Sequence, residues 1–176
     1  MNIFVLDTDP KIAASYHCDQ HLHKMILESA QMLCATLKHF RPDALIPYKT
    51  THANHPCTIW LRLKQNHVAY VISLAYELNH IRESLGRPDH SSIEVIRFCE
   101  AFLLPQKFPS DYPILSPQEH IFCGPYILSV RNDIDVVEKY KQYYQKKHLS
   151  WLLDKGKGMT YKGRPVPYFM QELLSK

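Results

Sequence analysis

Polar and ionisable residues recur at spacings of three or four positions near the start of the chain. They are His17, His21, Lys24, Glu28 and Gln31. No Gly or Pro interrupts residues 11–41, so this segment favours helix. Because residues three or four positions apart lie on one helical face, we expect a single ionisable stripe. Such a stripe can transfer protons, bind a metal or supply a lysine amine.

Glu28 is unusual because its neighbours are apolar. The sequence from Met25 to Leu37 is apolar around most of a helical circumference, which predicts that this half of the helix is buried. A buried carboxylate is costly unless it is paired or hydrogen-bonded. Glu28 is therefore either half of a structural ion pair, for instance with Lys24, or a functional carboxylate flanked by His21 and Lys24.

The composition is that of an ordinary globular protein. The chain has 176 residues, of which 45% are hydrophobic and 22% charged, and this length fits one domain over residues 1–176. No apolar run is long enough to span a membrane, and because Asp7 and Asp9 interrupt the short apolar start, we expect no secretory signal. The five cysteines have no CxxC spacing, which favours reduced thiols in a cytoplasmic protein.

The pattern predicts an all-α fold, a single compact helical domain with long irregular Pro-rich loops. Residues 1–6 are expected to form a strand or an extended arm. Helices are expected over residues 10–17, over 20–40 with Asp19 as cap, over 57–85 (continuous or broken near Asn66), over 93–104, over about 135–153, and from Tyr168. Five prolines make residues 105–133 mostly irregular: Pro105, Pro109, Pro113, Pro117 and Pro125.

Positive charge gathers towards the C-terminus. Residues 138–164 contain eight Lys or Arg against two acidic residues, and Tyr and Trp are interleaved with the cations in the basic aromatic segment 138–168. Cations alternating with aromatic rings suit a nucleic-acid backbone and stacked bases. The alternative is a solvated helix face whose tyrosines pack on the core.

A metal site is a second possibility for the ionisable stripe. His21 and Glu28 together with His52 and His55 offer three imidazoles and a carboxylate, although no HExxH or equivalent local motif is present. With 11 histidines in the chain, chance clusters are expected.

Several short motifs give the chain a resemblance to a known family. Asp19-Gln20-His21-Leu22 is followed by Glu28, seven residues after the histidine, and Asn54-His55-Pro56 precedes a long predicted helix. With the Lys-Tyr-Lys-Gln-Tyr-Tyr segment at 139–144, these pieces resemble the phage pyrimidine dimer DNA glycosylases, also called UV-specific endonuclease V enzymes. The match covers about a third of the chain in short pieces.

The resemblance implies a helical DNA glycosylase and AP lyase that needs no cofactor and no metal. In that family the N-terminal α-amine attacks the sugar C1′ of a damaged nucleotide, and a glutamate assists the proton transfers. An α-amine titrates near 7.7–8.0, so much of it is a free nucleophile near neutrality. Carried over, the nucleophile is the amine of Met1, which Asn at position 2 should leave in place, and the acid/base is Glu28, with His21 beside it. Lys24 offers a second amine if burial makes it nucleophilic.

The implied partner is double-stranded DNA, bound by a monomer. The expected DNA-binding residues are Gln20, Asn54, His55, Arg62, Tyr143, Tyr144, Lys146, Lys147, Lys155, Lys157 and Arg164. The substrate base stays open between a pyrimidine dimer and another damaged or modified base. Two rival functions stay open as well: a metal-dependent helical enzyme, and a nucleic-acid-binding protein without catalysis.

Overall fold

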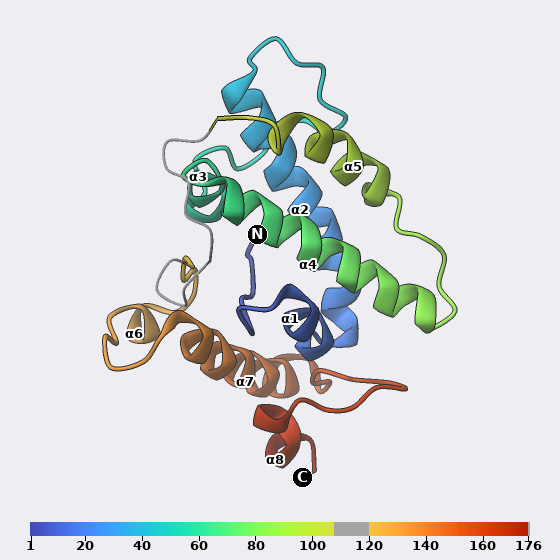
Figure 1. The fold of residues 1–176 in the computed structure, drawn as a ribbon. Helices are drawn as coiled ribbons and strands as arrows, with labels where there is room; N and C mark the ends of the chain where they lie inside the picture. Colours follow the sequence, from blue (N-terminus) through green and yellow to red (C-terminus); the bar gives the residue numbers. More distant parts are fainter. Residues whose placement is uncertain (108–119, 176) are drawn as a thin grey trace.

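The computed structural model describes residues 1–107 and 120–175, which are built from helices (Figure 1). The helices are α1 (Pro10–Tyr16), α2 (Asp19–Phe40), α3 (Pro56–Leu61), α4 (Gln65–Ser84), α5 (Ser92–Leu103), α6 (Tyr126–Ser129), α7 (Val136–Lys155), the 3₁₀ helix η2 (Tyr168–Met170) and α8 (Gln171–Leu174). No strand occurs among the described residues. The all-α prediction is confirmed.

Two helices begin at an aspartate that serves as the N-cap. The Asp9 carboxylate accepts a 2.8 Å hydrogen bond from the Lys11 N–H at the start of α1. The Asp135 carboxylate accepts one of the same length from the Glu138 N–H at the start of α7. Each bond satisfies a backbone donor that has no partner inside the helix. α7 ends at Gly156, whose φ of 64° lies in the left-handed region that glycine adopts without strain.

The start of α2 differs from the prediction that Asp19 caps it. Cys18 is the N-cap, and Asp19 is already helical. The Asp19 carboxylate accepts 2.8 Å hydrogen bonds from the Thr160 hydroxyl, the Lys162 N–H and the Arg164 guanidinium. The prediction was wrong because the partners of Asp19 lie in the distant C-terminal segment rather than in its own helix.

Residues 57–85, predicted as one long helix or as two, form α3 and α4. The chain between them is extended at Lys64, with φ of −148° and ψ of 144°. Across this break the His67 ring stacks on Trp60 at 4.0 Å, and His67 Nδ1 lies 2.7 Å from the Trp60 carbonyl oxygen. The second alternative is therefore present: the helix is broken, and the break falls just before Asn66.

The described part of the Pro-rich region contains one short helix that the pattern did not indicate. α6 covers Tyr126–Ser129, directly after Pro125. Pro109, Pro113 and Pro117 lie outside the described residues. The expected helix from Tyr168 is present as η2 followed by α8.

The N-terminal residues form a buried extended arm rather than a strand. α2 packs against α3, α4 and α5, and α1 packs against α4. In the arm, Ile3, Phe4 and the two residues after them are buried. The Phe4 ring stacks on His21 of α2 at 4.8 Å and meets the edge of Tyr144 of α7 at 5.3 Å. The arm is thus held between α2 and α7, and the N-terminus lies near the middle of the molecule (Figure 1).

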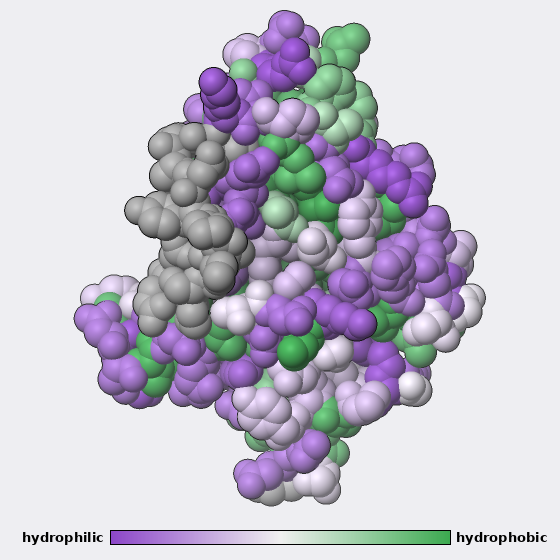
Figure 2. Space-filling model, viewed as in Figure 1, coloured by the Kyte–Doolittle hydropathy of each residue, from purple (hydrophilic) through white to green (hydrophobic). Residues whose placement is uncertain are grey.

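Hydrophilic residues predominate on the face shown in Figure 2, with several separate hydrophobic patches between them. Among the described residues, every helix is too short or too polar to cross a membrane.

Candidate functional site

A small pocket surrounds the N-terminus where the arm meets α2 and α7. Its volume is about 110 Å³, and it is lined by Met1, Asn2, Phe4, His21, Lys24, Met25, Glu28, Tyr143 and Lys147. All four residues that the sequence proposes as catalytic are among them. A larger groove of about 670 Å³ runs between α7 and α8, but it holds none of those four. The pocket at the N-terminus is therefore the candidate site.

The α-amine of Met1 and the carboxylate of Glu28 face each other in this pocket. The amine nitrogen lies 3.9 Å from Glu28 Oε1. The Met1 side chain is only 2% exposed, whereas the residue as a whole is partly exposed. The accessible surface of Met1 is therefore its main chain, which carries the amine. A buried side chain thus anchors the terminus, and Met1 lines the pocket.

Asn2 holds the arm in place, and sequence reasoning did not identify it. Its main-chain N–H donates a 2.8 Å hydrogen bond to Glu28 Oε2. Its side-chain Nδ2 donates to the Cys123 carbonyl at 2.6 Å, and its Oδ1 accepts from the Tyr140 hydroxyl at 2.9 Å. These partners come from α2, from α7 and from the loop before α6. No local spacing in the sequence could have revealed them.

Lys24 belongs to the rim of the pocket. Its Nζ lies 3.5 Å from Glu28 Oε1, one helical turn away. Its side chain is 61% exposed, compared with 11% for Glu28. The burial on which a nucleophilic Lys24 depends is absent. The geometry gives Lys24 the position of a surface cation beside the carboxylate.

His21 lines the pocket, but His17 does not share its helical face. His17 is the C-cap of α1, so the stripe predicted from position 17 begins at His21 instead. His21 Nδ1 and the Tyr144 hydroxyl are 2.6 Å apart and hydrogen-bonded. Burial, reinforced by the charges of His17, Lys147 and Lys24, lowers the pKa of His21 well below its usual value. The imidazole is therefore neutral near pH 7.

The tyrosines of the basic aromatic segment have two different environments. Tyr140 and Tyr144 are fully buried, so the prediction that Tyr144 contacts DNA is corrected: its ring has no accessible face for a base. The Tyr144 hydroxyl bonds to His21 and accepts from the Cys18 N–H at 3.0 Å. Tyr143 is only partly buried and lines the pocket.

Cations of α7 stand beside the same opening. Lys147 Nζ lies 5.8 Å from the centre of the Tyr143 ring and 5.2 Å from that of Trp151. Lys155 Nζ also contacts Trp151, at 5.4 Å from the centre of its ring. Partial burial, with the nearby charge of Lys24, lowers the pKa of Lys147. Lys146 and Lys157 are exposed, so each can reach a ligand.

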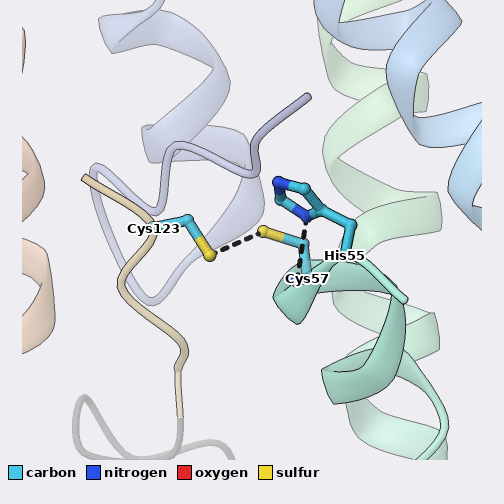
Figure 3. A group of neighbouring side chains, drawn as sticks. All are labelled: His55, Cys57 and Cys123. Carbon is cyan, nitrogen blue, oxygen red and sulfur yellow. Dashed lines mark hydrogen bonds between the residues drawn. The ribbon is translucent and has the colours of Figure 1, made fainter. Parts of the chain in front are cut away.

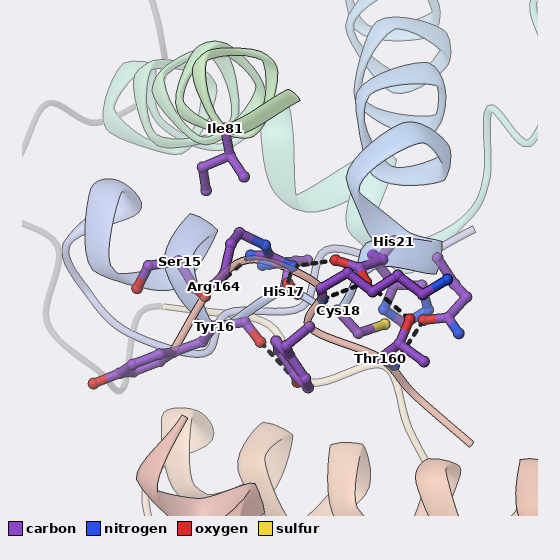
Figure 4. A network of polar contacts seen from close by, with 12 residues as sticks. Ser15, Tyr16, His17, Cys18, His21, Ile81, Thr160 and Arg164 are labelled. Atoms are coloured by element: carbon purple, nitrogen blue, oxygen red, sulfur yellow. Dashed lines mark hydrogen bonds and ion pairs between the residues drawn. The ribbon is translucent and has the colours of Figure 1, made fainter. Parts of the chain in front are cut away.

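Arg164 and Gln20 both make hydrogen bonds to other parts of the chain, although Gln20 is exposed. The Arg164 guanidinium donates 2.8 Å hydrogen bonds to Asp19 and to the His17 carbonyl at the junction of α1 and α2 (Figure 4). Gln20 donates to the Gly158 carbonyl at 3.1 Å and accepts from the Thr160 N–H at 3.2 Å. Both side chains fix the segment after α7. The predicted DNA contact of Arg164 is corrected to a structural role, because its guanidinium is paired with Asp19 and its side chain is only 9% exposed. The DNA contact predicted for Gln20, which is exposed, stays a prediction.

The Asn54-His55 motif lies at the start of α3. Asn54 is exposed. The Arg62 guanidinium donates a 2.8 Å hydrogen bond to the Ala53 carbonyl and so supports this loop from within. Burial, followed by the positive charges of the N-terminus and of His52, lowers the pKa of His55. His55 does not line the pocket.

The four residues of the alternative metal set do not form one group. Among the described residues, three or more possible ligands converge only at His55, Cys57 and Cys123. His21 and Glu28 belong to the pocket at the N-terminus. The rings of His52 and His55 are 6.5 Å apart.

Comparisons with protein-family models, with curated proteins and with solved structures find no match to this chain.

Proposed function

We propose that this chain is a DNA glycosylase and AP lyase whose nucleophile is the α-amine of Met1 and whose acid/base is Glu28. The observation that carries the proposal is the 3.9 Å separation between this amine and Glu28 Oε1 inside one pocket. Of the two amines near Glu28, the one on Met1 is held by a buried side chain and the one on Lys24 is not.

The arrangement suits Schiff-base chemistry at a sugar carbon. The amine attacks C1′ of the target nucleotide, the bond from C1′ to the base breaks, and the base leaves with a proton. The nitrogen lone pair then expels O4′ from C1′, O4′ takes up a proton, and the sugar ring opens to a protonated Schiff base. Removal of a proton from C2′ then expels the 3′-phosphate by β-elimination. Glu28 is within reach of the nitrogen for these proton transfers, and a carboxylate also stabilises the cationic sugar.

The size of the pocket fits a ligand that presents only its reacting part. A volume of about 110 Å³ is well below the 300–1,000 Å³ typical of sites that enclose a whole small molecule. A pocket of this size suits an extruded nucleotide whose sugar enters the pocket while its base stays outside. A damaged or modified base stacks poorly, which lowers the cost of extrusion.

The rim of the pocket favours a polyanion. Lys24 and Lys147 line it, and Lys155 lies on the Trp151 ring next to them. Lysines neutralise phosphates, and accessible aromatic rings such as Tyr143 and Trp151 stack on unpaired bases.

Borohydride trapping tests the proposal. The protein is incubated with duplexes that carry an abasic site or one of a panel of damaged bases, and borohydride then reduces any Schiff base to a stable adduct. We expect a covalent adduct whose cross-linked peptide contains Met1, and no adduct when the N-terminus is acetylated. An adduct mapped to Lys24 contradicts the assigned nucleophile. Salt-sensitive binding without any adduct identifies a non-catalytic DNA-binding protein.

A further inference from the structure

Three possible metal ligands meet beside the N-terminal arm, outside the pocket described above. They are His55, the N-cap of α3; Cys57, in the first turn of α3; and Cys123, in the loop before α6 (Figure 3). One ligand atom from each lies within 4.8 Å of the others. The two sulfur atoms are 3.2 Å apart although 66 positions separate the cysteines in the chain.

We propose that His55, Cys57 and Cys123 bind a borderline-soft divalent cation of the Zn²⁺ type. Two thiolates and an imidazole are the ligands that Zn²⁺ prefers in proteins, and a fourth position is commonly taken by water. Binding releases the two thiol protons, and the two thiolates then balance the charge of the ion.

The sulfur separation is closer to a metal site than to a disulfide. Two sulfurs on one tetrahedral Zn²⁺ are about 3.8 Å apart, because each Zn–S bond is about 2.3 Å. The observed 3.2 Å needs a small opening to reach that value. A disulfide instead needs the sulfurs to close to about 2.05 Å, which moves them more than about 1 Å together.

The imidazole is already turned towards the first turn of α3. His55 Nδ1 accepts a 3.2 Å hydrogen bond from the Cys57 N–H, longer than the usual 2.9–3.0 Å. Coordination through the ring replaces this weak bond. Figure 3 shows the ring and both sulfurs on the same side of the start of α3.

The site connects directly to the arm through Asn2. Cys57 Sγ lies 3.9 Å from Asn2 Oδ1, and the Cys123 carbonyl accepts the Asn2 side-chain bond. A bound ion therefore ties the loop before α6 to α3 at the point where both contact the arm. The inference does not rest on the proposed function, because none of the three ligands lines the pocket that holds Glu28 and the amine.

Metal analysis of the purified full chain tests the proposal. After purification with a thiol reductant and removal of free metal, Zn²⁺ is added back and the retained metal is measured. We expect about one equivalent. Replacement by Co²⁺ should give the near-ultraviolet charge-transfer absorption that thiolate ligands produce. Cys57→Ser and Cys123→Ser should each weaken Co²⁺ binding at least tenfold, and His55→Ala should weaken it while both thiols remain.

Cys34 and Cys99 provide a matched control. Their sulfurs are 3.7 Å apart in the core, yet no third ligand joins them among the described residues. Cys34→Ser should therefore leave Co²⁺ binding unchanged, and circular dichroism shows whether each variant is folded. Binding that survives Cys57→Ser in a folded protein overturns the proposal. So does a metal-free protein whose intact mass, under non-reducing conditions, is two hydrogens lower because Cys57 and Cys123 form a disulfide.

Discussion

The main-chain N–H of Asn2 donates a 2.8 Å hydrogen bond to Glu28 Oε2, while the other oxygen of the same carboxylate lies 3.9 Å from the Met1 nitrogen. One residue of α2 thus both anchors the arm and faces its terminal amine. The backbone bond restrains the carboxylate, because it holds one of the two oxygens against the arm. The stability of the arm and, in the proposed mechanism, catalysis at the amine therefore depend on the same side chain.

Glu28→Gln should remove the proton transfers and keep the arm in place. The amide oxygen of Gln still accepts from the Asn2 N–H, but the amide cannot take a proton. We expect trapping on abasic DNA to slow by about 10²-fold or more, the range for loss of a general acid or base. Glu94→Gln on the exposed face of α5 is the matched control. Trapping by Glu28→Gln at the native rate, in a protein that melts normally, would falsify the role of Glu28.

Asn2→Asp should loosen the arm, although the two side chains are nearly isosteric. The change replaces the Nδ2 donor with an oxygen that faces the Cys123 carbonyl 2.6 Å away. Losing a buried donor costs about 1–3 kcal/mol of unfolding free energy, measurable by urea denaturation. We also expect slower trapping, because the amine of Met1 is no longer held opposite Glu28.

Tyr140→Phe serves as the comparison for Asn2→Asp. It removes only the hydroxyl that donates to Asn2 Oδ1 and that accepts from the Cys123 N–H at 3.0 Å. We expect a loss of stability with a smaller effect on trapping, since the main-chain N–H of Asn2 keeps its hydrogen bond to Glu28. Equal rates of trapping in Asn2→Asp and the native protein contradict the positioning role of Asn2.

The cations at the rim should contribute to DNA affinity and to its salt dependence. Each lysine that contacts a phosphate adds about 0.9 to the slope of log K against log salt for duplex DNA. Lys24→Ala and Lys147→Ala should therefore each weaken binding and lower that slope by about 1. Lys49→Ala is the control, because Lys49 is exposed and lies in the loop that follows the C-terminal end of α2, whereas the pocket is at the N-terminal half of that helix. Slopes unchanged in both variants place the DNA elsewhere.

Much of the fold follows from local chemistry that a sequence displays. Asp9 and Asp135 cap their helices because a carboxylate satisfies free N–H groups one turn away. Glu28 could be identified as a polar residue on a buried face because burial follows helical periodicity.

The contacts that complete the site were not predictable in the same way. Asn2 bonds to residues 26, 121 and 138 positions away, and no spacing rule spans such distances. Tyr144 and Arg164 have the residue types of a DNA surface, yet one is buried and the other is paired with Asp19. The type of a residue indicates which chemistry it can perform, whereas tertiary packing decides whether its side chain is accessible to a ligand.

Acid should destabilise the protein through its buried histidines. Burial lowers the pKa of His17 from 6.5 to about 4, and the positive charge of Arg164 adds to this, while the bond of His17 to the Ala13 carbonyl opposes it. Between these two pH values the unfolded chain binds a proton that the native state does not. The stability contributed by the neutral ring is therefore complete above pH 6.5 and is lost as the pH falls towards 4.

His17→Gln tests this pH dependence directly. A shift of this size corresponds to a contribution on the order of 3 kcal/mol, since one pKa unit is worth about 1.4 kcal/mol. We expect the native unfolding free energy to fall between pH 7 and pH 4.5, and the fall to be smaller in His17→Gln, whatever that variant loses at pH 7. His39→Gln, on the exposed end of α2, should keep the native pH dependence. Chemical denaturation at a series of pH values measures all three, and identical slopes in His17→Gln and the native protein contradict the assignment.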